Sequence, residues 1–156
     1  MSDFIILAAQ KADSSLIVSL LSELAEYEKL LDNFTLDEVA VARDMFGEAC
    51  HCDLAFAGDE AVGIATWFWT YNSFRAVRGL YVEDLFVRTR FRGRGYGRRL
   101  LAHLAGIAVK ADAFLLWQVL DWNAPSIAFY KSLGAAPQEN WITYRLRGEA
   151  LRRLAS

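Results

Sequence analysis

The sequence has no large excess of charge of either sign, because its 17 Lys and Arg residues are set against 19 Asp and Glu residues and leave a net charge of −2. A protein that binds nucleic acid carries a basic excess, so we predict no nucleic-acid partner. No apolar run reaches the roughly 18 residues that span a bilayer, and the first residues lack the basic stretch of a secretory signal. We therefore predict no membrane partner and a cytoplasmic location.

Cysteine and histidine are also scarce, with two of each. Cys50 and Cys52 flank His51, and three adjacent ligands cannot easily close around one tetrahedral metal ion. His103 lies apart from them, in an expected helix, so the sequence has no second cluster of such ligands. We predict no metal site, buried or half-buried thiols in a reducing compartment, and a packing or surface role for His103.

Linkers, repeats and low-complexity tracts are absent as well. Apolar residues make up 54% of the 156 residues, a composition that supports a packed core rather than disorder. We predict one domain over residues 1–156.

Hydrophobic spacing predicts strands that alternate with helices. The strands are expected at residues 4–7, 54–57, 61–71, 79–87, 114–119 and 141–146, and the helices at 13–29, 35–46, directly after 97, and 123–133. Strand 114–119 is expected to be buried, because it is short and apolar. The order β-α-α-β-β-β-α-β-α-β predicts an α/β fold with a central mixed, mostly antiparallel sheet and helices on both faces.

Polar residues and glycine mark the expected helix ends. Thr35 and Glu38 form a capping-box pattern before the second helix, and Gly47 would stop it. Asp13 would cap the first helix, and Asn123 would open the last one.

The most informative stretch is Arg92-Gly93-Arg94-Gly95-Tyr96-Gly97-Arg98-Arg99, which directly precedes the apolar stripe of a helix. Alternate glycines let backbone N–H groups approach a ligand, the start of a helix attracts anions, and arginines add donors for phosphate. The stretch lacks the Lys-Ser/Thr pair of a P-loop, and its third glycine comes one residue early for a dinucleotide fingerprint. We therefore predict a pyrophosphate site, with a glycine-rich surface turn as the simpler alternative.

The spacing Arg92-x-x-Gly95-x-Gly97, after the strand-like run 81–87, resembles the coenzyme A pyrophosphate loop of the GNAT N-acetyltransferase superfamily. Segments 23–28, 80–87 and 122–131 look like the diamine (spermidine/spermine) acetyltransferase family, which includes thialysine acetyltransferase relatives. The resemblance implies the GNAT fold, a homodimer, and acetyl-CoA as co-substrate without a metal. It also implies acetyl transfer, by direct attack in a ternary complex, to a primary amine of a small molecule such as a polyamine or a lysine-like or thialysine-like amino acid.

By the same resemblance, the coenzyme A site would draw on three segments of the chain. The predicted residues are Leu85, Phe86 and Val87 on the strand, Arg92, Gly93, Arg94, Gly95, Tyr96, Gly97 and Arg98 in the loop, and Asn123 and Ser126 at the last helix. Leu85 and Val87 would offer backbone groups to amides of the co-substrate, as one strand adds to another. Asn123 could equally be a helix cap.

Acetyl transfer to an amine needs a base near the amine and a proton donor near the departing thiolate. Glu83 lies among apolar residues, where partial burial would suit it to proton transfer, and the resemblance implies that it acts through a water molecule. The resemblance also implies that Tyr130 is the acid at the thioester sulfur. Structurally, Glu83 could instead pair with Arg78 or Arg88, and Tyr130 could be a core aromatic residue. Asp84 would face the other way by strand alternation and serve as a structural partner.

The predicted substrate-binding residues are Tyr27, Glu28, Asn72, Glu83, Trp117 and Glu139. The acidic segment around Tyr27 could equally be a solvated helix end. Asn72 stands where the resembled family has an acidic residue, and Arg75 and Arg78 in the same loop would suit a substrate with a carboxylate.

Two other functions stay open at this point. The chain could be an acyl-CoA-binding regulatory module that binds the co-substrate without turnover. It could also acetylate protein lysines or N-termini, although bulky residues such as Trp67 and Trp69 argue against an open peptide groove. The aromatic run 67–71 exceeds what one sheet face needs and favours a homodimer.

Overall fold

The computed structural model describes residues 3–156, and the chain divides into two compact units, Met1–Gln118 and Val119–Ser156. The elements of the first unit are β1 (Phe4–Ala8), α1 (Ser14–Tyr27), α2 (Glu38–Asp44), β2 (His51–Ala57), β3 (Glu60–Asn72), β4 (Val77–Val87), α3 (Tyr96–Lys110) and β5 (Phe114–Trp117). The second unit contains α4 (Ala124–Ser132) and α5 (Gly148–Ala155).

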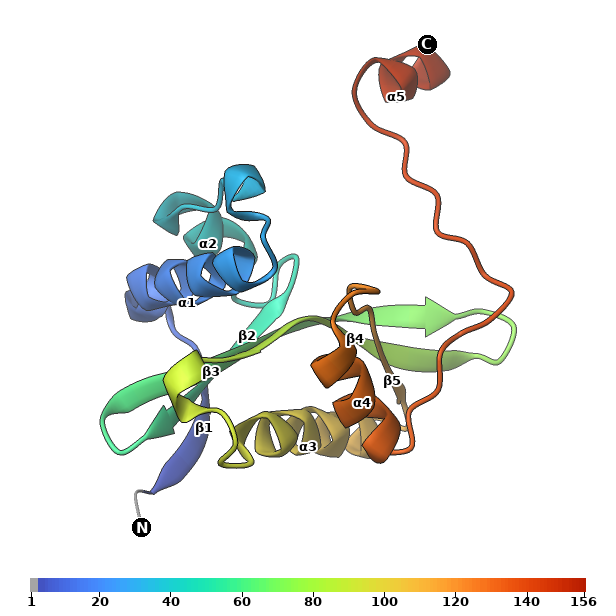
Figure 1. Cartoon of the computed structure of the whole chain (residues 1–156). Coiled ribbons are helices and arrows are strands. Elements are labelled where there is room, and N and C mark those ends of the chain that lie inside the picture. Colours follow the sequence, from blue (N-terminus) through green and yellow to red (C-terminus); the bar gives the residue numbers. More distant parts are fainter. Residues whose placement is uncertain (1–2) are drawn as a thin grey trace. The chain divides into compact units, whose positions relative to one another are not determined.

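The first unit is a layered α/β structure. Its sheet has the order β1-β2-β3-β4-β5, and all neighbours are antiparallel except β4 and β5, which are parallel. α1 and α2 cover one face of the sheet and α3 covers the other (Figure 1). This mixed, mostly antiparallel sheet confirms the predicted fold class, and α3 supplies the crossover that the parallel pair requires.

Apolar side chains hold the layers of the first unit together. Leu20 and Leu24 of α1 are buried in one cluster with the sheet residue Phe86. On the other face, Leu100 and Leu104 of α3 are fully buried. Each such side chain contributes about 1.5–3 kcal/mol on burial, so the helices are held by the apolar stripes that their spacing supplies.

The second helix differs from the prediction at both ends. Its cap is Asp37 rather than Thr35, because Asp37 is the last extended residue and its Oδ1 accepts a hydrogen bond from Ala40 N at 2.8 Å. The helix also ends earlier than the predicted Phe46, at Asp44.

Of the caps predicted for the first and last helices, one is wrong and one is confirmed. Asp13 precedes α1 as predicted, but its Oδ2 accepts from Gln10 N at 2.8 Å instead of capping the helix. Asn123 caps α4 as predicted, since its Oδ1 accepts from Ser126 N at 3.3 Å. The left-handed Gly134, with φ of +87°, follows the end of that helix.

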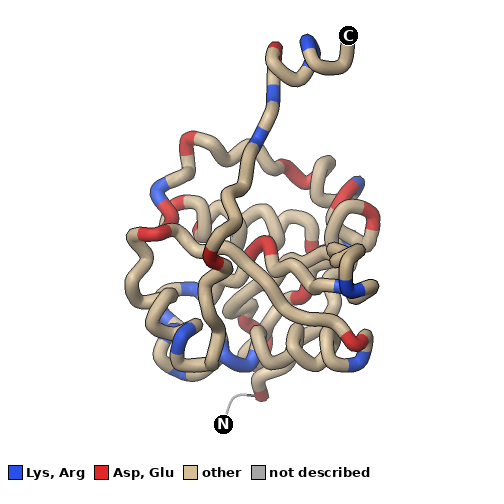
Figure 2. The backbone as a smooth tube through the Cα atoms, turned by 90° about the vertical axis from the view of Figure 1, so that its right-hand side faces the viewer, with Lys and Arg blue, Asp and Glu red and all other residues tan. Residues whose placement is uncertain are grey.

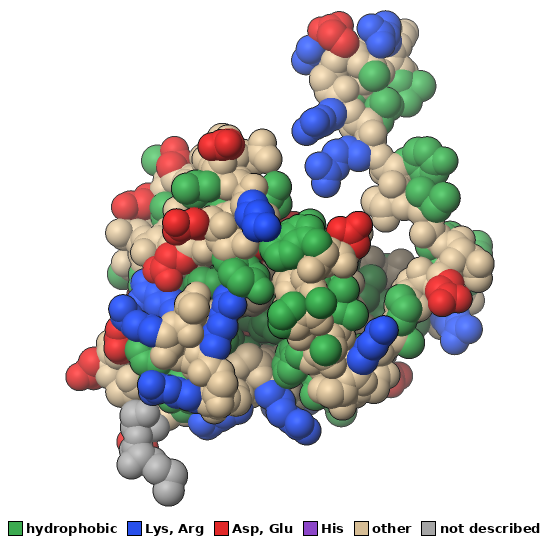
Figure 3. All heavy atoms as spheres, viewed as in Figure 1, with side chains coloured by type: hydrophobic (Ala, Val, Ile, Leu, Met, Phe, Trp, Pro, Cys, Tyr) green, Lys and Arg blue, Asp and Glu red, His purple; other side chains and the backbone are tan. Residues whose placement is uncertain are grey.

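The prediction of a strand at residues 141–146 is wrong. Trp141, Ile142 and Tyr144 are 80%, 79% and 89% exposed, and the chain continues into α5, a helix that the spacing did not predict. Figure 3 shows hydrophobic side chains exposed along this segment. A strand needs a neighbour for its backbone hydrogen bonds, and no strand among residues 3–156 pairs with this segment.

The strand predicted at 114–119 is shorter and less buried than expected. β5 ends at Trp117, its last three residues are half-buried, and Phe114 is exposed. β5 lies at the edge of the sheet, where β4 covers one side of its backbone, so full burial was the wrong expectation for this strand.

The distribution of charges and the burial of the two thiols agree with what the composition predicts. Acidic and basic residues are interspersed along the backbone of the first unit (Figure 2). Cys50 is half-buried and Cys52 is buried, as predicted, and burial raises the pKa of the Cys50 thiol to about 11. In the described part of the chain, no three His, Cys, Asp or Glu side chains gather as metal ligands would, and no helix has the length and apolarity of a membrane span.

Candidate active site

The glycine loop leads straight into α3. Gly93 and Gly95 have φ of +76° and +78°, a left-handed backbone that favours glycine, and a Cβ on either residue would meet no atom within 4 Å. α3 begins at Tyr96, so the N–H groups of its first turn have no partner inside the helix. The open space, these N–H groups and the positive end of the helix suit a pyrophosphate.

The arginines of this loop differ in their contacts. Arg94 and Arg98 are exposed, so their guanidinium groups are accessible to an anion. Arg92 donates from Nε to Val87 O at 3.0 Å, and its Cζ lies 4.2 Å from the ring centroid of Tyr27. Arg92 therefore ties the loop both to the end of β4 and to the end of α1.

Two aromatic residues among the predicted coenzyme A residues, Phe86 and Tyr96, have buried side chains. Tyr96 stacks on Phe4 with ring centroids 4.6 Å apart, and this contact anchors the start of α3. Phe86 belongs to the core cluster under α1. Either residue could serve a ligand through its backbone, not through its ring.

The second half of β4 has one backbone edge that β5 does not cover. The pairing of β4 with β5 runs from Gly79 to Val82 and stops there. Arg88 N donates to Val62 O of β3 at 2.9 Å, so by alternation the backbone groups of Leu85 and Val87 point away from β3. Their direction matches the predicted role of these two residues, which is to pair with amides of the co-substrate.

A bulge interrupts the pairing of β3 with β4 at Glu83. Thr66 lies opposite Asp84 and Trp67 lies opposite Val82, so Glu83 has no opposite residue. The predicted opposite orientation of Glu83 and Asp84 is therefore wrong, because the extra residue returns Asp84 to the sheet face that α1 covers. Bulges of this kind often re-aim side chains beside active sites.

Two carboxyl groups, those of Glu83 and Glu28, lie near enough to this bulge for their charges to act on Asp84. Burial raises the pKa of Asp84 to about 6; a hydrogen bond from Thr66 opposes the rise, and the nearby charges of Glu83 and Glu28 add to it. Burial raises the pKa of Glu28 at the end of α1, and burial followed by the charge of Glu83 raises the pKa of Tyr81. Glu83 itself is exposed rather than partly buried. We call Glu28, Glu83 and Asp84 the acidic cluster.

Sequence reasoning did not include Asp84 in the site. The run Glu83-Asp84 showed two adjacent acids, but strand alternation assigned them to opposite faces. A bulge depends on how β3 and β4 register, and the sequence of β4 carries no local mark of it.

The other predicted substrate residues of the first unit lie at different distances from the acidic cluster. Trp117 pairs with Val82, one residue before Glu83. Asn72 pairs with Val77 at the far end of the hairpin, about 20 Å from Thr66 at ~3.3 Å per residue. Its Oδ1 accepts from Arg75 N at 3.2 Å within the turn. The structure therefore brings Trp117, but not Asn72, to Glu83.

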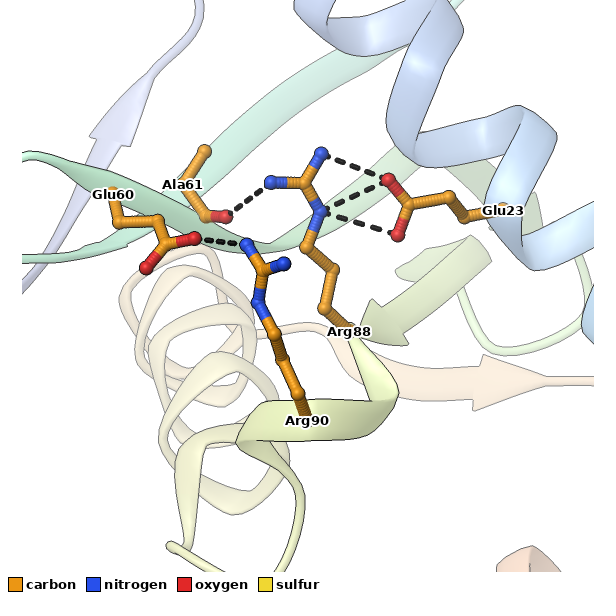
Figure 4. Close-up of polar contacts among 5 residues, drawn as sticks. All are labelled: Glu23, Glu60, Ala61, Arg88 and Arg90. Atoms are coloured by element: carbon orange, nitrogen blue, oxygen red, sulfur yellow. Dashed lines mark hydrogen bonds and ion pairs between the residues drawn. The ribbon is translucent and has the colours of Figure 1, made fainter.

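The arginines that could have paired with Glu83 have other partners. Arg88 binds both carboxylate oxygens of Glu23 at about 3 Å and donates from Nη1 to Ala61 O at 2.9 Å (Figure 4). Arg78 has its Cζ 5.8 Å from the centroid of a Trp69 ring. These contacts leave Glu83 without the structural pairing considered from the sequence.

The second unit carries the remaining predicted residues. Ser126 and Tyr130 are half-buried and lie four residues apart on α4, and Asn123 caps that helix. The ring centroid of Tyr130 is 5.3 Å from that of Phe129. Glu139 is exposed in the segment after α4.

Comparison with known proteins assigns the family. The model of the Acetyltransferase (GNAT) family matches residues 17–135. Thialysine N-epsilon-acetyltransferase of Bos taurus is 36% identical over 161 residues, which cover 94% of each chain, and that of Caenorhabditis elegans is 31% identical over 99% of each. This chain belongs to the GNAT family of acetyltransferases, and it is an N-acetyltransferase.

Solved structures agree with the fold. An integron cassette protein from the mobile metagenome of V. cholerae superimposes with a TM-score of 0.82 at 29% identity, over 99% of this chain and 98% of the other. A ribosomal-protein-alanine N-acetyltransferase from Brucella melitensis, at 18% identity and a TM-score of 0.74, shares the fold. GNAT acetyltransferases use acetyl-CoA, and the open loop before α3 fits its pyrophosphate.

Proposed function

We propose that this enzyme transfers the acetyl group of acetyl-CoA to a primary amine of a small cationic molecule, by direct attack in a ternary complex. The observation that carries the proposal is the position of the acidic cluster. It lies at the bulge of β4, where the strand's open edge begins, and that edge leads directly into the glycine loop. An ammonium group held by the carboxylates would thus lie beside the thioester of a co-substrate whose amides pair with Leu85 and Val87.

The chemistry needs three proton transfers. At pH 7 a primary ammonium group with a pKa near 10.4 costs about 4–5 kcal/mol to deprotonate. Glu83 accepts that proton through a water molecule, and the neutral amine nitrogen then bonds to the acetyl carbon. Tyr130 donates its hydroxyl proton to the sulfur as the carbon–sulfur bond breaks, and the second proton that the nitrogen loses restores the Tyr130 hydroxyl through solvent. The products are an N-acetylated amine and a free thiol, and no covalent enzyme intermediate is required.

For the substrate we propose a lysine-like or thialysine-like amino acid, with a polyamine as the second choice. Support comes from relatives named for thialysine, and from one named L-ornithine N5-acetyltransferase of Arabidopsis thaliana, which is 41% identical over 57% of this chain and 40% of its own length. Arg75 lies in the hairpin turn beyond Asn72, about 20 Å from the acidic cluster at ~3.3 Å per residue, so it does not reach a carboxylate on such a substrate within the same chain.

A thiol-release assay with acetyl-CoA and a panel of lysine, thialysine, ornithine and spermidine tests the proposal. We expect turnover with at least one amine, and a loss of about 100-fold in Glu83→Gln, within the range for an acid–base residue. The matched control is Glu48→Gln, another exposed carboxylate, which should keep full activity. If the protein binds acetyl-CoA by calorimetry but no amine releases thiol, the regulatory-module alternative replaces this proposal.

We further propose that both units act as one acetyltransferase domain, that the enzyme is a homodimer, and that it works in the cytoplasm. The family match at residues 17–135 crosses the border between the units at residue 118. The exposed apolar segment 141–146 supports a partner chain better than the aromatic run 67–71 does, because Trp67 is buried within this chain. The free thiols of Cys50 and Cys52 suit a reducing compartment.

A further inference from the structure

Thr66 is a buried polar residue on β3, opposite Asp84 at the bulge. It is 1% exposed, and its Oγ1 lies 2.5 Å from Asp84 Oδ2. A buried hydroxyl is costly unless it forms a hydrogen bond, and an ionised carboxylate can only accept one. Thr66 therefore donates to Asp84 when that carboxyl is charged, and this bond favours the charged form.

The other groups around Asp84 act in the opposite direction. Glu83 on β4 and Glu28 at the end of α1 place negative charges near it. The thiols of Cys50 and Cys52, before and within β2, are close enough to respond to the charge of Asp84. Burial also favours the neutral acid. The hydrogen bond from Thr66 is thus the interaction that holds this carboxyl ionised against its surroundings.

We propose that Thr66 is a positioning residue that keeps Asp84 ionised and directed into the acidic cluster, and so sets the lower pH limit at which the enzyme binds its cationic amine. The inference rests on the proposed function. When Asp84 is protonated, the cluster loses one of its negative charges and attracts an ammonium group less well. Without the Thr66 hydroxyl, protonation occurs at a higher pH.

The test compares Thr66→Val, which keeps the shape of the side chain without the hydroxyl, with Thr66→Ser, which keeps the hydroxyl. The ratio of kcat/KM between variant and parent is measured from pH 5.5 to 9 with the best amine of the panel, so that titration of the amine itself cancels. If the hydrogen bond lowers the pKa of Asp84 by about one unit, the kcat/KM of Thr66→Val should be about fivefold below that of the parent at pH 6 and equal to it at pH 9. The kcat/KM of Thr66→Ser should stay close to that of the parent over the whole pH range.

A ratio for Thr66→Val that does not change with pH would overturn the inference, because a purely structural loss acts at every pH. The second comparison is between the double variant Asp84→Asn/Thr66→Val and the single variant Asp84→Asn. The ratio of their kcat/KM values should not change with pH, and a ratio that still changes with pH would also overturn the inference.

A second measurement needs neither Thr66→Val nor activity. Carbon-13 NMR of the Asp84 carboxyl should show titration near pH 6 in the parent protein and in Thr66→Ser, and titration below pH 5 would overturn the inference. If the parent acetylates no amine, the proposed function fails while this NMR result still reports on the Thr66–Asp84 pair.

Discussion

Tyr130 could act as the acid that protonates the thiolate or only as an aromatic residue packed on its helix, and only the first role needs its hydroxyl group. Tyr130→Phe should lower kcat by about tenfold to a thousandfold, because the departing thiolate then lacks its proton donor. Binding of acetyl-CoA should change little. Thiol release gives kcat, and calorimetry gives the dissociation constant.

Tyr144→Phe is the matched control for that variant, since Tyr144 lies in the same unit and is 89% exposed. It should keep normal turnover. Unchanged turnover in Tyr130→Phe would remove Tyr130 from the mechanism and return it to its packing role beside Phe129.

Asp84 should make stability depend on pH. Its pKa rises from 3.8 to about 6 on folding, first because of burial, so the folded state binds more protons than the unfolded state between these values. The free energy of unfolding should therefore fall as the pH rises from 4 to above 6, by about 2 kcal/mol. Asp84→Asn should remove this fall, as measured by urea unfolding at pH 4 and pH 8.

Asp59→Asn is the control for the stability measurement, because Asp59 is exposed in the turn between β2 and β3. It should show the same fall with pH as the parent protein. Equal falls in the parent and in Asp84→Asn would show that Asp84 does not titrate as described.

Among the elements, the loop before α3 was the best predicted from the sequence. Alternate glycines, flanking arginines and a following apolar stripe are all local features, and in the structure a helix follows the glycines, with its start at Tyr96 instead of directly after residue 97. The left-handed conformation of Gly93 and Gly95 was not predicted. The bulge in β4 was not predicted, because it arises from the register of two strands. Glu83 was thus identified from its sequence context, whereas Asp84 entered the site only through the pairing of β3 with β4.

Gly95→Ala tests the backbone conformation of this loop. A Cβ there meets no neighbour, so its effect comes from the φ of +78°, at a cost of about 1–2 kcal/mol. We expect a lower free energy of unfolding and a raised KM for acetyl-CoA, both measured on the purified protein.

Gly106→Ala is the matched control, since Gly106 lies inside α3 with open space around it. It should stabilise the protein by about 0.5–1 kcal/mol and leave KM unchanged. A Gly95→Ala variant that behaves like Gly106→Ala would argue against a strained, ligand-binding loop.

At the scale of the whole molecule, segment 141–146 presents several large apolar side chains that are exposed in a single chain. Light scattering at micromolar concentration should give the mass of a dimer for the parent protein. Trp141→Ser should shift the mass toward the monomer, because it removes a large apolar side chain that is 80% exposed in the single chain.

Phe74→Ser is the control for this experiment, since Phe74 is 97% exposed but lies in the turn between β3 and β4. It should leave the dimer intact. A monomeric parent protein would refute the homodimer. If Trp141→Ser and Phe74→Ser shifted the mass equally, segment 141–146 would have no specific role in the dimer interface.

The sequence by itself determined the α/β class, most of the helices and strands, and the pyrophosphate loop, because spacing, caps and glycine positions act over a few residues. Tertiary structure decided which carboxylates meet, which arginines are engaged and whether an alternating segment becomes a strand. Those outcomes depend on partners far along the chain: β3 sets the side on which Asp84 lies, Glu23 binds Arg88, and residues 141–146 find no strand to pair with in the described chain.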